Sequence, residues 1–219
     1  MLCLLSRVSM LMPVLWVAWH ASCLETPGSP MYAFLNGSLI NWLSTQDLDI
    51  LCLTSSWPQE NLKAKLVEIN HKFYLVPSRD PRATYQVLWY HITETDSCIK
   101  VDILFPGVLD IPDVPLSLID HNNIYNLPCT PLSHLLLLKL QGWIHHGEST
   151  AQRYRQKQPQ DEQDINELLA IACLRGLRPR EERYLPRSFI LRAELRVQKY
   201  VRACPSSERS WRALGFVLP

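Results

Sequence analysis

The sequence lacks the short motifs that mark the commoner hydrolases, ATPases and dinucleotide-binding enzymes. It contains no Gly-x-Ser-x-Gly, no phosphate-loop Gly-Lys-[Ser/Thr] and no Gly-x-Gly-x-x-Gly. It also has no internal repeat and no low-complexity tract. Its 47% apolar and 20% charged residues are ordinary for a globular chain. With 219 residues, it is long enough for one domain with a small helical addition and too short for several domains.

An excess of charge of one sign is also missing. The chain has 22 basic and 21 acidic residues, a net charge of +1, which argues against a strongly polybasic nucleic-acid protein, so no stable complex with DNA is expected. The charge is nevertheless divided unevenly, because 14 of the basic and 8 of the acidic residues lie from position 150 onward. The two halves of the chain therefore differ in charge and are expected to differ in role.

The cysteines show no paired spacing. Their number is odd, none forms Cys-x-x-Cys, and none has a histidine at zinc-finger spacing. We interpret them as free thiols, which favours a reducing compartment and a cytoplasmic location. They stand at positions 3, 23, 52, 98, 129, 173 and 204.

The N-terminal segment, by contrast, has features of a secreted or membrane-anchored protein. Residues 8–24 are mostly apolar and follow Arg7, as in a secretory signal. Pro13 and His20 interrupt the segment, whereas a bilayer helix needs about 20 mainly apolar residues, so membrane association is not favoured. A signal or anchor, a helix leading into the fold and an inaccurate gene start all stay open. In a secreted chain, the sequon at Asn36 would carry a glycan.

The first half of the chain predicts mainly strands. Short β-rich stretches are bounded by turn residues, one helix follows the second of them, and the last two strands are predicted to form a hairpin. The expected strands are 31–35, 48–53, 73–76, 84–92 and 98–105, and the helix is 59–69.

The second half predicts helices. Residues 106–131 suit an extended connector with one strand near 116–119, and helices are expected at 132–144, 161–174 and 188–203. The fold class is therefore α/β in the α+β sense, a small mixed sheet flanked by helices and followed by a helical C-terminal part. The expected divisions are an N-terminal apolar segment, an α/β domain and a helical region, at 1–30, 31–130 and 131–219.

Three aspartates occupy strand positions that suggest a metal site. Asp47 and Asp49 stand two apart, so both leave the same face of a sheet. Asp102 lies inside an apolar strand, where an unpaired charge is costly. If the two strands are neighbours, the three carboxylates form an all-oxygen site suited to Mg²⁺, and two such ions can hold an attacking hydroxyl and a leaving pyrophosphate in line.

Gly37 and Ser38 come shortly before this pair. A sharp turn from a strand into a short helix at 39–43 would expose N–H groups to a triphosphate. The same residues also suit a two-residue hairpin turn without any phosphate, and both interpretations stay open.

In this order the motifs resemble the nucleotidyltransferase fold of the DNA polymerase β superfamily, which has an apolar strand, Gly-[Gly/Ser], a short helix, Asp-x-Asp and a third Asp on a later strand. Residues 77–85, 101–107 and 135–143 are similar to uncharacterised fungal proteins related to abortive-infection nucleotidyltransferase toxins. The resemblance covers roughly residues 31–175, including the helices that bear Lys139 and Asp164.

The resemblance implies a transferase that uses a nucleoside triphosphate and two Mg²⁺ ions. Asp47, Asp49 and Asp102 would hold the metal, with Asp102 also orienting the acceptor hydroxyl. Gly37 and Ser38 would seat the triphosphate. In the helical half, Lys139 would reach a phosphate as a point charge. The acceptor, whether RNA, protein or a small molecule, is not implied.

Other interpretations remain beside this one. Asp47 and Asp49 would be solvent-facing if their strand lay at an edge, Asp102 would simply pair with Lys100 or an arginine, and Lys139 would pair with a carboxylate such as Asp164. A shortened spacing from Gly-Ser to Asp-x-Asp leaves open a catalytically silent binding module, and residues 8–24 leave open a secreted or membrane-anchored protein.

Further charged residues are weaker candidates. Arg79 and Arg82 would steer phosphates or simply be solvated. A metal site at His145 and His146 is not expected, because adjacent helical residues point in different directions. The basic residues of 188–203 would form a solvated outer face or, alternatively, a polynucleotide-binding face.

Overall fold

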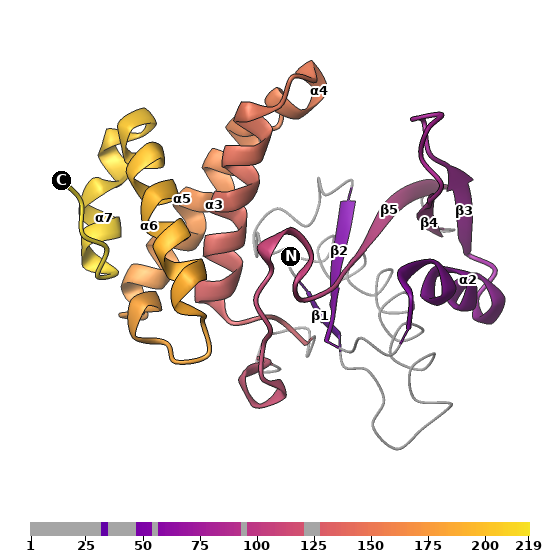
Figure 1. Ribbon diagram of the computed structural model, residues 1–219, viewed down its shortest axis with the longest axis horizontal. Coiled ribbons are helices and arrows are strands. Elements are labelled where there is room, and N and C mark those ends of the chain that lie inside the picture. The colour runs from indigo at the N-terminus through magenta and orange to yellow at the C-terminus, as the bar shows by residue number, and fades with distance from the viewer. Residues whose placement is uncertain (1–31, 35–46, 54–56, 93–95, 121–127) are drawn as a thin grey trace. The chain divides into compact units, whose positions relative to one another are not determined.

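The computed structural model describes residues 32–34, 47–53, 57–92, 96–120 and 128–219, with side chains from residue 48 onward. These form two compact units (Figure 1). The first comes from the chain up to Val108 and from Ile119–Cys129, and the second from Leu109–Leu118 and Thr130–Pro219. The apolar segment at 8–24 lies outside the described residues, so its interpretations are unchanged.

A five-stranded mixed sheet forms the first unit, in the order β1-β2-β5-β4-β3. Only the pairing of β2 with β5 is parallel, and the other described pairings are antiparallel. The expected hairpin between the last two strands is confirmed as β4 and β5, and the expected α+β class is confirmed. The strands are β1 (Tyr32–Phe34), β2 (Asp47–Cys52), β3 (Phe73–Pro77), β4 (Gln86–Ile92) and β5 (Ser97–Leu104).

One face of this sheet is buried against α2 (Gln59–Ile69). In β5 the side chains of Ile99, Val101 and Ile103 are buried, while the residues between them are half-buried. This alternation of period two is expected for a strand with one face on a core. Leu62 and Leu66 of α2 belong to the same apolar cluster, and each buried leucine contributes about 2 kcal/mol by leaving water.

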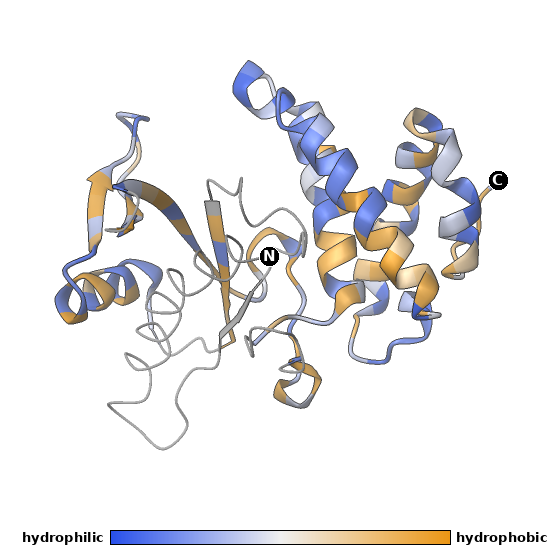
Figure 2. Ribbon diagram, turned by 180° about the vertical axis from the view of Figure 1, so that it is seen from behind, coloured by the Kyte–Doolittle hydropathy of each residue, from blue (hydrophilic) through white to orange (hydrophobic). Residues whose placement is uncertain are grey.

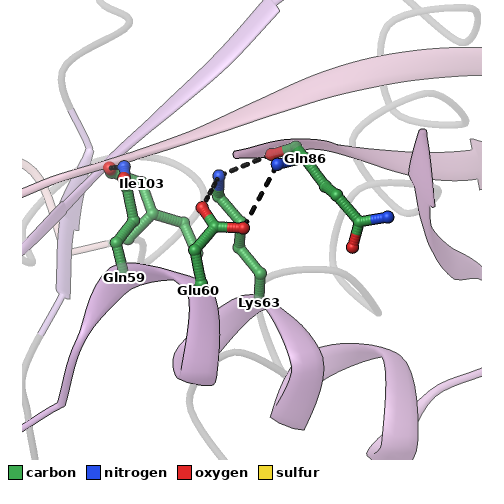
Figure 3. Close-up of polar contacts among 5 residues, drawn as sticks. All are labelled: Gln59, Glu60, Lys63, Gln86 and Ile103. Carbon is green, nitrogen blue, oxygen red and sulfur yellow. Dashed lines mark hydrogen bonds and ion pairs between the residues drawn. The ribbon is translucent and has the colours of Figure 1, made fainter. Parts of the chain in front are cut away.

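A lysine in α2 joins this helix to the start of β4 (Figure 3). The Nζ of Lys63 donates to the Glu60 carboxylate and to the Gln86 carbonyl, both at 2.6 Å, and the Gln86 N–H donates to Glu60 at 3.2 Å. Lys63 is only 5% exposed. Although burial raises the pKa of Glu60, the hydrogen bonds from Lys63 and Gln86 outweigh it and lower that pKa. The charged pair therefore satisfies both backbone groups of Gln86.

The connector after β5 differs from the sequence expectation. The strand expected near 116–119 is wrong, because Leu116–Leu118 is a short 3-10 helix, η2, and Val108–Asp110 forms another, η1. Pro115 accounts for η2, since its fixed φ suits the start of a helical turn and its carbonyl accepts from the N–H of Leu118.

The second unit is helical. α3 packs against both α5 and α6, and a series of edge-to-face aromatic contacts links Trp143 with Tyr200, Tyr200 with Trp211, and Trp211 with Phe216. In Figure 2 the strands of the first unit are mainly hydrophobic in colour, whereas α4 and the adjoining end of α3 are hydrophilic. The elements are α3 (Leu132–Glu148), α4 (Gln152–Arg155), α5 (Gln158–Leu174), η3 (Pro179–Glu181), α6 (Arg187–Ala203), η4 (Pro205–Ser207) and α7 (Glu208–Ala213).

A histidine is enclosed in the helical unit. His134, in the first turn of α3, is 0% exposed. Burial lowers the pKa of His134 from 6.5 to about 4, because a charged imidazole would lose its hydration there. The side chain is therefore neutral at pH 7.

Replacing the buried lysine tests the connection between α2 and β4. Lys63→Ala should lower the free energy of unfolding by about 1–3 kcal/mol, because it removes the donor of the Gln86 carbonyl. Urea denaturation at constant m-value measures this change. Lys65→Ala, which breaks the exposed pair with Glu68 on the same helix, should have little effect. Equal midpoints for the two variants would contradict the role given to Lys63.

The buried histidine predicts a pH-dependent stability. Between about pH 6.5 and pH 4 the unfolded chain binds a proton at His134 and the folded chain does not, so stability rises with pH across this range and is lost as the pH falls. The expected contribution is about 3 kcal/mol.

Urea denaturation as a function of pH measures this contribution. His134→Leu should flatten the profile between pH 4 and pH 6.5, whereas His145→Gln, at an exposed position of the same helix, should leave it unchanged. If the unfolding free energy of His134→Leu changed with pH as steeply as that of the wild type, this histidine would not be protected from protonation.

Candidate functional site

Two of the predicted site aspartates lie opposite each other on neighbouring strands. The parallel register of β2 and β5 pairs Asp49 with Asp102. The pairs before and after it, Leu48 with Val101 and Ile50 with Ile103, are 1–2% exposed and lie in the core. Because side chains alternate along a strand, Asp49 and Asp102 are on the face away from α2. The condition that the two strands be neighbours is therefore met.

The third aspartate is described by its backbone alone. Asp47 begins β2 and pairs in register with Lys100, so it shares a row of the sheet with that lysine. β2 lies between β1 and β5, but the described pairing with β1 covers only Ile50–Cys52. The alternative that Asp47 and Asp49 face solvent at an edge therefore stays open. Gly37 and Ser38 lie outside the described residues, so their role at a triphosphate stays a prediction.

A lysine already neutralises one of the carboxylates. The Nζ of Lys100 forms a hydrogen-bonded ion pair with Asp102 two residues away on the same face. Their side chains are 33% and 37% exposed. The alternative pairing of Asp102 with Lys100 is thus confirmed as a contact. Because Lys100 is also the register partner of Asp47, a cation stands in the row next to that of Asp49 and Asp102.

Aromatic residues extend the row of Lys100 across the sheet. Trp89 of β4 lies opposite Lys100, and Tyr74 of β3 lies opposite Trp89. All three side chains are half-buried. A hydrogen bond with the Cys98 thiol, together with burial, raises the pKa of Tyr74 to about 12. The sequence does not reveal that Trp89 and Tyr74 lie in the row of Lys100. Their places depend on the registers of β4 with β5 and of β3 with β4.

The donor chemistry of this face fits a hard cation. No group of three His, Cys, Asp or Glu residues that could hold a metal ion occurs where side chains are described, and Asp47 falls outside that set. The carboxylates of Asp49 and Asp102 are nevertheless of the kind that Mg²⁺ takes, since this ion is usually held by one or two carboxylates together with substrate phosphates and water.

The predicted phosphate-binding lysine of the helical unit is also paired. Lys139 of α3 donates to Asp164 of α5 at 3.0 Å, and Gln160 donates to the second oxygen of the same carboxylate at 2.9 Å. The side chain of Asp164 is 9% exposed and that of Lys139 is 21% exposed. The expected alternative, an ion pair with Asp164, is confirmed as a contact, and binding of phosphate by Lys139 stays a prediction.

Most other charged candidates have carboxylate partners. Arg82 pairs with Asp80 at 3.3 Å, and His146 lies 2.5 Å from Asp161 with its ring stacked on Tyr154. Three of the basic side chains of α6 have carboxylate partners as well, which weakens the case for a polynucleotide-binding face. Their pairs are Arg192 and Arg196 with Asp110, and Lys199 with Glu148.

No protein-family model matches the chain, and no curated protein matches it. Among the helices that the structure describes, none combines the length and the apolar character needed to cross a membrane.

The pair formed by Lys139 and Asp164 can be tested directly. Lys139→Met should lower the free energy of unfolding by about 3 kcal/mol, because it leaves a mostly buried carboxylate without its cation. The double variant Lys139→Met/Asp164→Leu should regain most of this loss, since no charge is then left unpaired.

Urea denaturation measures both effects. Lys199→Met breaks an exposed pair in the same unit and should leave the unfolding midpoint nearly unchanged. A single Lys139→Met variant as stable as the wild type would show that the pair is not structural.

Proposed function

We propose that the chain is a metal-dependent nucleotidyltransferase-like protein that transfers a nucleotidyl group from a nucleoside triphosphate to an acceptor hydroxyl. The observation that carries this proposal is the register that sets Asp49 opposite Asp102 on the half-exposed face of the sheet. The order of motifs that resembles the polymerase β superfamily supports the same activity, as an analogy.

The residues of the site then divide into metal ligands and triphosphate ligands. Asp49 and Asp102, with Asp47, would hold Mg²⁺, and Asp102 would also orient the acceptor hydroxyl. Gly37 and Ser38 would seat the triphosphate through backbone N–H groups and a hydroxyl. Bound Mg²⁺ would neutralise charge that develops on the attacking and leaving oxygens.

The proposal also covers Lys139 of the helical unit, the acceptor and the cellular location. Lys139 would bind a phosphate as a point charge only by giving up its contact with Asp164. The acceptor is RNA, protein or a small molecule. A cytoplasmic location is proposed with it, supported by the five cysteines that the structure describes, none of which forms a disulfide.

A second candidate, a catalytically silent module with the same fold, is favoured by a different observation. The ion pair between Lys100 and Asp102 already compensates the charge that a metal would otherwise balance. Such a module would keep the sheet and its polar face for binding and would release no pyrophosphate.

Turnover with substituted aspartates tests the proposal. Purified protein with Mg²⁺ and labelled nucleoside triphosphates should release pyrophosphate, and Asp49→Asn/Asp102→Asn should reduce the rate by at least about 100-fold, because charge stabilisation in the transition state is lost. The matched control is Asp80→Asn/Asp96→Asn, which removes two exposed carboxylates from the same unit and should turn over normally.

Three results would argue otherwise. Unchanged turnover in Asp49→Asn/Asp102→Asn would exclude this face as the catalytic site. Triphosphate binding by a wild-type protein that releases no pyrophosphate would favour the silent module. A wild-type protein that binds neither divalent cation nor triphosphate would reject both candidates.

A further inference from the structure

Lys100 stands among the acidic positions of the candidate site. It shares one face of β5 with Asp102, and the register of β2 places Asp47 opposite Lys100 and Asp49 opposite Asp102. Three acidic positions and one basic position thus occupy two adjacent rows of two neighbouring strands. The ammonium group of Lys100 is hydrogen-bonded to Asp102, so it occupies one of the carboxylates that a divalent cation would use.

This ion pair is of a kind that can exchange. Both side chains are about one third exposed, at 33% and 37%, and pairs in contact with water change an equilibrium by no more than about fivefold. A lysine side chain also has a flexible four-carbon stem, while the backbone of β5 is held between β2 and β4. The ammonium can therefore leave Asp102 without any change in the sheet.

A tryptophan on the neighbouring strand offers an apolar surface to the side-chain stem of Lys100. Trp89 lies directly opposite it in β4, and side chains opposite each other in an antiparallel pair have Cβ atoms about 5 Å apart. A lysine stem can lie along an apolar ring while its charge stays in water. The ammonium group is thus kept on this face of the sheet in either state.

We propose that Lys100 is the exchangeable counter-ion of the site. Without a divalent cation its ammonium neutralises Asp102, and when that carboxylate binds the cation, Lys100 binds a phosphate oxygen of the triphosphate. The inference rests on the proposed function and adds to it the residue that links cation binding to triphosphate binding. A compact ammonium suits both partners, since it binds carboxylate and phosphate as a point charge.

Two consequences separate this role from a purely structural one. Removing the charge at position 100 should strengthen the binding of a divalent cation, because a competitor for Asp102 is lost. The same change should weaken the binding of a triphosphate, because a phosphate ligand is lost. A lysine that only stabilised the sheet would produce neither of these opposite effects.

The test uses Lys100→Gln in the full chain, with Mn²⁺ as the spectroscopic probe. Electron paramagnetic resonance of free Mn²⁺, without nucleotide, should show about two- to fivefold tighter binding in the variant. Calorimetric titration with α,β-methylene ATP at saturating Mn²⁺ should show about five- to tenfold weaker binding. Neither measurement depends on turnover.

Two further variants serve as controls. Lys100→Arg keeps the positive charge and should bind Mn²⁺ as the wild type does. Lys65→Gln breaks the pair with Glu68 on α2, away from the site, and should change neither affinity. Thermal denaturation of all three variants checks that each is folded at the temperature of the titrations.

The outcomes distinguish this inference from the proposed function. If the wild type binds Mn²⁺ and triphosphate but Lys100→Gln matches Lys65→Gln in either affinity, the role of Lys100 is overturned and the proposed function stands. If neither the wild type nor Lys100→Gln binds Mn²⁺, both are overturned.

Discussion

The parallel pairing of β2 with β5 is the constraint on which the candidate site depends. The two strands are separated in the chain by α2, β3 and β4, so their pairing joins segments that are far apart in the sequence. Their register buries Leu48 and Ile50 beside Val101 and Ile103. Because side chains alternate, the same register leaves Asp49 and Asp102 on the opposite face. A shift of one residue would exchange the core with the acidic face, so apolar burial also secures the position of the carboxylates.

Each unit contains an ion pair between a lysine and an aspartate, and the two pairs differ in their exposure to water. Lys100 and Asp102 are each about one third exposed, so water and a competing cation can replace their contact. Asp164 is 9% exposed and receives hydrogen bonds from both Lys139 and Gln160. Breaking that pair would leave a charge poorly solvated. The first pair is suited to exchange and the second to holding α3 against α5.

Particular residues show how far the sequence was informative and where it failed. The two-residue spacing of Asp47 and Asp49 and the apolar spacing of the main helices are local patterns, and they identified the shared face of the two aspartates and the helices. The strand expected near 116–119 was wrong, because Pro115 begins a 3-10 turn there. Trp89 was not recognised as a neighbour of Lys100, since their pairing depends on the register of the hairpin.

The sequence by itself determined the α+β class, the order of most elements and the alternation that separates Asp49 and Asp102 from the core, because each follows from interactions between residues close in the chain. Only the tertiary structure decided that β2 lies beside β5 and that Asp49 faces Asp102. It also showed that Lys100 pairs with Asp102. Those facts arise from the packing of α2 and four strands on one core, where distant segments compete for the same neighbours and no local pattern records the result.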